Sequence, residues 1–251
     1  MTDLLLSTVI QTLVDWDTQI FLAINGLHND YWDNFMQMFS GRFIWLPFYL
    51  SIAYVMFRCF PWRVNVTCLI VLALLITIND QMSGSLIRSF VGRLRPANTD
   101  NPISPLVHIV DGYRGGRYGF PSAHSANCWG LAFFIYYVFR RHLLTTTLMA
   151  WAFITCWSRM YLGVHYFGDI IVGMLVGVVT ASLVYYAFQR SLHRMTETYK
   201  PYQPDAPHMY IPVMVCWLEI LLMLILSFGY NAHTDTMDTF TCSSWYYARY
   251  T

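Results

Sequence analysis

Long apolar runs separated by short polar segments make up most of the chain. A spanning helix needs about 20 predominantly apolar residues, and about six runs meet that length. Because only helices and closed barrels satisfy the backbone inside a bilayer, the pattern predicts an all-α, polytopic helix bundle. We expect one domain over residues 1–251, without an internal repeat. The predicted spans cover residues 36–57, 64–87, 122–139, 143–162, 167–189 and 210–228.

The run at residues 4–25 differs from the others because Asp15 and Asp17 lie near its middle. A carboxylate at the centre of a bilayer is energetically costly. The pattern therefore favours a helix that lies in the membrane interface, with a seventh span as the alternative.

Three polar segments interrupt the apolar pattern. The loop 88–121 carries five arginines, and a loop of that length in a compact domain usually has a function. Residues 190–208 contain three prolines and are predicted to be a cytoplasmic linker. Residues 229–251 form a polar, tyrosine-rich tail.

Basic residues in the short connections set the expected orientation, because loops rich in Arg and Lys stay in the cytoplasm. The loop 88–121 and the turn near 163–165 then face the extracytoplasmic side. The basic residues that fall together on the cytoplasmic side are Arg58, Arg63, Arg140, Arg141, Arg190, Arg194 and Lys200.

The composition agrees with a membrane protein and narrows its chemistry. Charged residues make up 12% of the chain, against about 25% in soluble domains. A net charge of +1 provides no basic field for nucleic acid, so the expected partners are membrane lipids. Lys200 is the only lysine, and Arg is the better residue for gripping phosphate with a planar fork. The six cysteines lack ligand-like spacing and are interpreted as small core residues.

Residues 158–169 place Arg159, His165 and Asp169 between two apolar runs. His165 and Asp169 are four residues apart, so a helix that begins after His165 would bring them together. A carboxylate that accepts one ring N–H fixes the histidine tautomer and makes the other nitrogen a better nucleophile. Pairs at this spacing are more often structural, so the catalytic interpretation depends on residues elsewhere in the chain.

Two further polar clusters are expected at the same membrane face. One runs from Arg88 to Arg95 at the outer end of the second predicted span. In the other, Pro121 and Ser122 precede His124 and predict the start of a helix, with Ser122 as its cap or a first-turn donor. Helix N-termini attract anions. Arginines, a helix N-terminus and an oriented histidine together predict a phosphoryl-transfer site.

In this order and on one face, the clusters resemble the three motifs of the type 2 phosphatidic acid phosphatase (PAP2) family, the membrane relatives of vanadium haloperoxidases. The family patterns read K-x6-R-P, P-S-G-H and S-R-x5-H-x3-D. The resemblance is close over residues 85–170. The matching residues are Arg88, Arg95 and Pro96; Pro121, Ser122, Ala123 and His124; and Ser158, Arg159, His165 and Asp169.

The chain departs from the family pattern at two positions. Arg88 replaces a lysine, which keeps the positive charge and adds a planar fork. Ala123 replaces a glycine, which is tolerable if φ is negative and costs about 1 kcal/mol or more if φ is positive. We expect negative φ because the residue begins a helix.

The resemblance implies a role for each residue. His165 is the nucleophile and forms a phosphohistidine, Asp169 orients it, and His124 protonates the leaving oxygen and then activates water. Neither a cofactor nor a metal is implied, because arginines stabilise the developing charge. The groups implied to hold the phosphate oxygens are the side chains of Arg88, Arg95, Arg159 and Ser122 and the N–H of Ala123.

The implied function is metal-independent hydrolysis of a lipid phosphate on the outer face of a bacterial inner membrane. Undecaprenyl diphosphate, phosphatidylglycerophosphate, phosphatidic acid and lipid A stay open as substrates. The alternatives are a lipid phosphotransferase and a non-catalytic lipid-binding or transport protein; retention of His124 and His165 favours an enzyme. For Asp80 and Glu219 we expect structural roles, and for Arg114 and Arg117 either a second anion or a solvated loop.

Overall fold

The computed structural model describes residues 2–195 and 207–231, and throughout these ranges the chain is built from helices without a strand. The all-α prediction is therefore confirmed. The helices are α1 (Thr2–Asn25), α2 (Asp30–Phe39), α3 (Leu46–Cys59), α4 (Trp62–Asp80), the π-helical turn η1 (Gln81–Leu86), α5 (Ile87–Val91), the 3-10 turns η2 (Ser104–Leu106) and η3 (Val110–Gly112), α6 (Ala123–Phe139), α7 (His142–Tyr161), α8 (Phe167–Met195), the 3-10 turn η4 (Pro207–Tyr210) and α9 (Ile211–Asn231).

Three helical stretches of the described chain are long and apolar enough to cross a membrane: Trp62–Val91, Phe167–Ser191 and His208–Phe228. The first is continuous through α4, η1 and α5, and the polar residues Asn79 and Asp80 precede its π-helical turn. Asp80 accepts a hydrogen bond from the Asn127 amide of α6 at 2.8 Å, so it pairs within the bundle as expected. The protein is an integral membrane protein, and the number of six spans stays a prediction.

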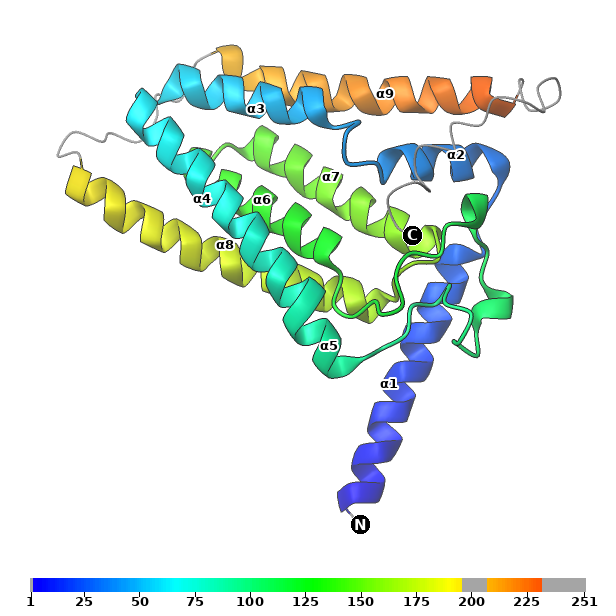
Figure 1. The fold of residues 1–251 in the computed structure, drawn as a ribbon. Coiled ribbons are helices and arrows are strands. Elements are labelled where there is room, and N and C mark those ends of the chain that lie inside the picture. The colour runs from blue at the N-terminus through cyan, green and yellow to red at the C-terminus, as the bar shows by residue number, and fades with distance from the viewer. Residues whose placement is uncertain (1, 196–206, 232–251) are drawn as a thin grey trace.

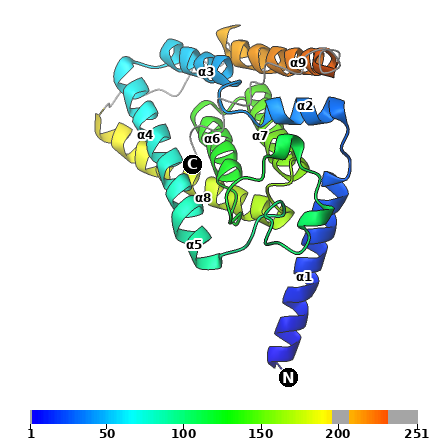
Figure 2. The same ribbon diagram turned by 45° about the vertical axis from the view of Figure 1, so that its right-hand side comes forward.

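Helix α6 lies at the centre of the bundle, where it contacts α4, α7 and α8 (Figures 1 and 2). Glycines let α8 approach α6 closely. A Cβ atom on Gly173 would lie 2.4 Å from the Ser122 carbonyl oxygen, and one on Gly177 would lie 2.2 Å from the Ala126 carbonyl oxygen. Small residues permit such backbone contact between membrane helices. The contact fixes the start of α6 against the second and third turns of α8.

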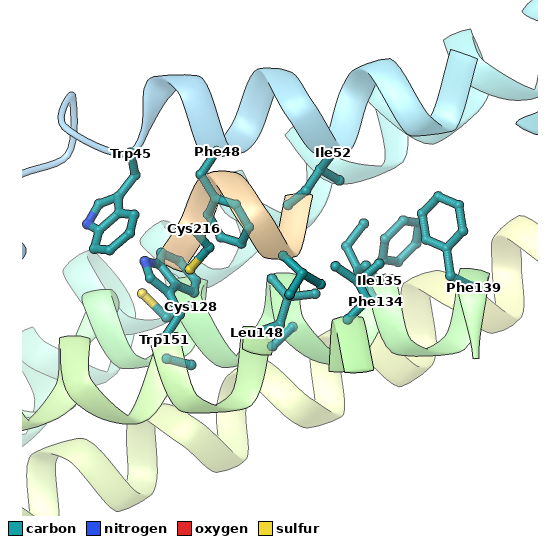
Figure 3. Packing of buried hydrophobic residues seen from close by; sticks show 14 of the residues in the cluster. Trp45, Phe48, Ile52, Cys128, Phe134, Ile135, Phe139, Leu148, Trp151 and Cys216 are labelled. Atoms are coloured by element: carbon teal, nitrogen blue, oxygen red, sulfur yellow. The ribbon is translucent and has the colours of Figure 1, made fainter. Parts of the chain in front are cut away.

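Aromatic and aliphatic side chains fill the space between these helices and the α3–α9 layer. Figure 3 shows Trp45, Phe48 and Ile52 facing side chains that rise from α6 and α7. The Trp45 and Trp151 rings, for example, meet edge to face with centroids 5.9 Å apart. Close packing of this kind holds membrane helices together, because lipid tails provide no net hydrophobic drive for helix association.

The predicted span 36–57 is wrong as a continuous helix. Helix α2 ends at Phe39 and α3 begins at Leu46, and both pack along α9 (Figure 1). Gly41 lies just after α2, and Pro47 occupies the first turn of α3, where its missing N–H costs no helical hydrogen bond. The buried Trp45 ring donates its N–H to the Phe39 carbonyl at 2.9 Å and so closes the end of α2.

Glu219 of α9 explains how this break is tolerated. The first N–H groups of a helix lack intrahelical partners, and in an apolar environment each one left unpaired is costly. The Glu219 carboxylate accepts the Phe48 N–H at 3.2 Å, in the first turn of α3. Glu219 therefore has the structural role expected of it.

Two predicted segments differ from the structure at their boundaries. The linker 190–208 is wrong at its start, because α8 continues as a helix to Met195, and at its end, because residues 207 and 208 belong to the 3-10 turn η4; residues 196–206 lie outside the described residues. Helix α9 runs to Asn231, so the first three residues of the predicted tail, 229–231, belong to it, and residues 232–251 lie outside the described part of the chain.

Residues 4–25 form part of a single helix, α1. Its N-terminal half extends away from the bundle, with Val9 and Leu13 exposed, whereas Phe21 and Ile24 near its end are buried (Figures 1 and 2). The end of α1 contacts α7 and α8. The choice between an interfacial helix and a seventh span stays a prediction, because these contacts fit both.

Candidate active site

Three segments meet where α5, α6 and α8 come together: the chain after α5, the first turn of α6 and the turn between α7 and α8. An isolated β-bridge between Leu94 and Tyr118 closes the long loop across its base. Backbone hydrogen bonds from Arg95 to Arg117 and from Gly119 to Arg93 strengthen this closure, at 3.1 Å and 3.0 Å. The closure fixes the backbone that carries the first predicted motif.

His165 lies in the α7–α8 turn, and 1% of the residue is exposed. Its Nδ1 is 3.3 Å from Asp169 Oδ2, and the same oxygen accepts the Tyr166 N–H at 3.0 Å. Its Nε2 is 3.0 Å from Nη1 of Arg95. If Nδ1 carries the proton toward the carboxylate, Nε2 presents a lone pair to the guanidinium group. A Cβ on Gly119 would lie 3.0 Å from Asp169 Oδ2, so glycine is needed beside the pair.

The electrostatic environment keeps the His165 ring neutral. Burial, followed by the charges of Arg95, Arg159 and Arg88, holds the pKa of His165 well below its ordinary value. A neutral imidazole retains the lone pair that a nucleophile requires. In the unfolded chain the His165 ring is protonated more readily than in the folded protein. The free energy of unfolding therefore falls as the pH drops below about 6.5, the ordinary pKa of histidine.

Arg88, Arg95 and Arg159 form a cluster of like charges beside His165. Arg95 and Arg159 are 8% and 5% exposed. Burial and the charges of Arg159 and Arg88 lower the pKa of Arg95 to about 10, which leaves it charged at neutral pH. Among the described residues, the Nε atom of all three arginines is buried without a hydrogen-bond partner. Unpaired buried donors are costly and like charges repel, so a bound anion would relieve both.

Each of these arginines has another partner that fixes its direction. Arg88 donates to the Pro121 carbonyl at 3.3 Å, and Arg95 donates to the Val164 carbonyl at 2.9 Å. Arg159, in the last turn of α7, donates to the Ser40 hydroxyl. The guanidinium groups are therefore positioned by protein contacts, as a preorganised anion site requires.

The N-terminus of α6 supplies the second predicted motif. Ser122 is the N-cap residue, and its hydroxyl oxygen accepts the Ser125 N–H at 3.3 Å. The Ser122 N–H donates a hydrogen bond to the Asp169 carbonyl at 3.0 Å. The first N–H that the helix can offer to an anion is therefore that of Ala123. Within the described chain, Asp111 and Arg140 are the non-glycine residues with positive φ, so Ala123 carries no such strain. His124 follows, half-buried, within range of the charges of Arg159, Arg42 and Arg95.

The structure thus brings all eight predicted site residues to one place, and it adds residues that sequence reasoning missed. Ser40 and Arg42 come from the break between α2 and α3, where the sequence predicts an unbroken span. Tyr113 forms a side-chain hydrogen bond with Arg159. Arg93 and Asp17 form ion pairs behind Asp169. Two signals in the sequence could have identified Arg93 and Asp17: Arg93 lies inside the first motif, and a buried carboxylate such as Asp17 is energetically costly.

Arg114 and Arg117 support the loop. Arg114 donates to the Ala97 carbonyl at 2.7 Å and to the Ser104 hydroxyl at 3.1 Å. Arg117 pairs with Asp100 at 3.4 Å on the exposed surface. These contacts hold the loop to itself and agree with the solvated-loop interpretation.

Comparison with known proteins places this site in a family. The model of the PAP2 superfamily matches residues 66–193. The chain is 44% identical over 187 residues to a lipid A 4′-phosphatase of Bacteroides thetaiotaomicron, covering 74% of this chain and 83% of the relative. It is 33% identical over 196 residues to a lipid A 4′-phosphatase of Porphyromonas gingivalis, covering 77% and 82%.

Two solved structures share the fold. LpxE of Aquifex aeolicus superimposes with a TM-score of 0.52 and 22% identity, over 67% of this chain and 94% of that one. A PAP2-type phosphatidylglycerolphosphate phosphatase of Bacillus subtilis superimposes with a TM-score of 0.54 and 19% identity, over 78% and 94%. Together with the matches in sequence, the motifs and the helical architecture lead to one assignment: the chain belongs to the PAP2 superfamily.

Proposed function

We propose that this chain hydrolyses the 4′-phosphate ester of lipid A through a phosphohistidine formed on His165. As a member of its family, the chain is a membrane lipid phosphatase of the PAP2 type. The observation that carries the reaction is the cluster of three arginines with unpartnered Nε–H groups beside His165 Nε2. The choice of lipid A is supported by the two relatives of that name, which align over most of their length.

In the proposed first step, the Nε2 lone pair of His165 forms a bond to phosphorus. The bond between phosphorus and the sugar oxygen breaks, and His124 donates a ring proton to that oxygen, which leaves as a hydroxyl group. Asp169 stabilises the positive charge that develops on the His165 ring. Arg88, Arg95 and Arg159 stabilise the negative charge on the phosphoryl oxygens, so no metal takes part.

In the second step, His124 accepts a proton from a water molecule whose oxygen attacks the phosphorus of the phosphohistidine. The bond from Nε2 to phosphorus breaks, inorganic phosphate leaves, and His165 regains its lone pair. Water as the acceptor makes the enzyme a phosphatase. A lipid or sugar hydroxyl in the same position would make it a phosphotransferase.

The proposal predicts release of one phosphate from lipid A by the purified protein in detergent. The substrate panel contains lipid A, phosphatidylglycerophosphate, phosphatidic acid and undecaprenyl diphosphate, each with and without EDTA. We expect mass spectrometry to find lipid A that lacks the 4′-phosphate, at equal rates with and without EDTA. Preference for another lipid would overturn the substrate assignment. Activity lost in EDTA and restored by Mg²⁺ would overturn the metal-free mechanism.

We further propose that the site faces the extracytoplasmic side of a bacterial inner membrane, which the positions of the basic residues support. Thr99 is exposed in the long loop, and Thr198 lies in the predicted linker. In intact cells, or in spheroplasts if an outer membrane blocks access, Thr99→Cys should react with an impermeant maleimide. Thr198→Cys should react only after permeabilisation. The parent chain, with its native cysteines, sets the background, and the reverse pattern would move the site to the cytoplasm.

A further inference from the structure

Asp17 of α1 is tied to the bundle by two polar contacts. Its Oδ2 lies 2.7 Å from Nη2 of Arg93, and its Oδ1 accepts the Gly168 N–H at 2.7 Å. A Cβ on Gly168 would lie 2.9 Å from Asp17 Oδ2, so the glycine leaves room for this carboxylate. The side chain of Asp17 is 13% exposed. The contacts join the N-terminal helix to the first turn of α8.

Arg93 carries this connection onward to the predicted nucleophile. Its Nη1 lies 3.1 Å from Asp169 Oδ1, while Asp169 Oδ2 faces His165 Nδ1 at 3.3 Å. The guanidinium carbon also lies 3.9 Å from the centroid of the Tyr166 ring, within the range of a cation–π contact. The four residues Asp17, Arg93, Asp169 and His165 therefore form one continuous chain of charged and hydrogen-bonded side chains.

The alternation of negative and positive charges along this row of side chains indicates what Asp17 does. Asp169 is 0% exposed, and a buried carboxylate stays ionised only when charges and donors compensate it. Arg93 supplies that compensation, but its side chain is long and has many rotamers. A carboxylate on its far side holds the fork in one direction, since an arginine between two carboxylates has both ends fixed. Asp17 thereby determines where Asp169, and in turn His165, can lie.

We infer that Asp17 is a positioning residue for the phosphatase reaction, acting through Arg93 on the Asp169–His165 pair. The inference rests on the proposed function, and it gives α1 a part in the active site that none of the three motifs includes. It also explains why an apolar helix keeps a carboxylate despite the cost of placing one there.

Asp15 provides a matched control on the same helix. It is exposed, and its carboxylate accepts a hydrogen bond from Gln11 of α1 at 2.8 Å. The variants Asp17→Asn and Asp15→Asn make the same chemical change two residues apart. Asp17→Glu keeps the charge and tests whether a carboxylate alone restores part of the effect.

The experiment measures kcat and KM for whichever lipid of the panel the wild type hydrolyses, with folded enzyme quantified by its melting transition in detergent. Misplacing a reacting group by an ångström costs about 100-fold, so we expect Asp17→Asn to lower kcat by about 10- to 100-fold. We expect KM to stay within about twofold, because the phosphate-binding arginines are unchanged. Asp15→Asn should match the wild type, and Asp17→Glu should recover part of the loss.

Equal kcat in Asp17→Asn and Asp15→Asn, per folded enzyme, would overturn the inference while leaving the proposed function intact. A wild type without phosphatase activity would instead overturn the proposed function. If the wild type has no phosphatase activity, ¹⁵N spectra of the imidazole groups in the full chain still report the protonation of the His165 ring nitrogens. They should report a changed tautomer balance in Asp17→Asn but not in Asp15→Asn, and unchanged spectra in both variants would again overturn the inference.

Discussion

Replacing His165 with alanine should lower the turnover of the lipid phosphate by on the order of 10³-fold or more. The variant loses the Nε2 atom that lies 3.0 Å from Arg95 Nη1 and that we propose as the nucleophile, so no phosphohistidine can form at this position. Arg88, Arg95 and Arg159 are unchanged in this variant and should still bind the substrate phosphate, so KM should change far less than kcat. Steady-state phosphate release, measured with the substrate at saturation, tests this expectation.

His142→Ala is a suitable control for that measurement. His142 is exposed at the start of α7, and the site lies at the opposite end of that helix. Both variants should retain the wild-type melting transition in detergent, and only His165→Ala should lose activity. Comparable turnover in His165→Ala and the wild type would falsify the assignment of the nucleophile.

Replacing His124 with alanine should separate the two chemical steps. A sugar hydroxyl is a poor leaving group and needs a proton, so hydrolysis of lipid A should fall by about 10²- to 10⁴-fold. An aryl phosphate with an acidic phenol leaves without that proton, and its first step should be spared. We therefore expect a burst of phenol equal to one per active site, followed by slow turnover, because activation of water is also lost.

Rapid-mixing measurements with the aryl phosphate test this expectation. The wild type supplies the reference rate for both phases, and His165→Ala should show no burst. An equal loss in His124→Ala for both leaving groups, with no burst, would mean that His124 binds substrate and does not transfer protons.

Much of the site was predictable because its parts are local in sequence. The four-residue spacing of His165 and Asp169 brings them into contact as α8 begins. Ser122 signals the first turn of α6 by its capping chemistry, and the structure has it as N-cap. The residue spacing does not predict that the start of α6 packs against α8. This packing depends on Gly173 and Gly177, where the missing side chains let α8 contact the α6 backbone.

The break between α2 and α3 was not predictable from hydrophobic periodicity. Residues 36–57 are apolar enough to be predicted as one span, and one contact that supports the break, the hydrogen bond from the Phe48 N–H to Glu219, comes from another helix. A partner 171 residues away leaves no local signal. The missed contact of Ser40 with Arg159 is a consequence, since an unbroken helix would not present that hydroxyl to the site.

For Asp17 the sequence shows an unusual residue, a carboxylate in an apolar run, but does not predict its partner. The cost of a carboxylate in an apolar run was visible, and it favoured an interfacial helix. The structure provides a second reason for that carboxylate, the ion pair with Arg93 at 2.7 Å. No spacing rule links residue 17 to residue 93, because the contact arises only when α1 docks against α7 and α8.

The most direct test of the mechanism is to locate the phosphoryl group on the enzyme. His124→Ala, mixed with an aryl phosphate and quenched in alkali, should accumulate the intermediate, because phosphohistidine withstands base and the second step is blocked. Peptide mass spectrometry should then find one phosphoryl group on the peptide that contains His165. A phosphoryl group on any other residue, or a burst of phenol with no labelled peptide, would contradict the phosphohistidine mechanism.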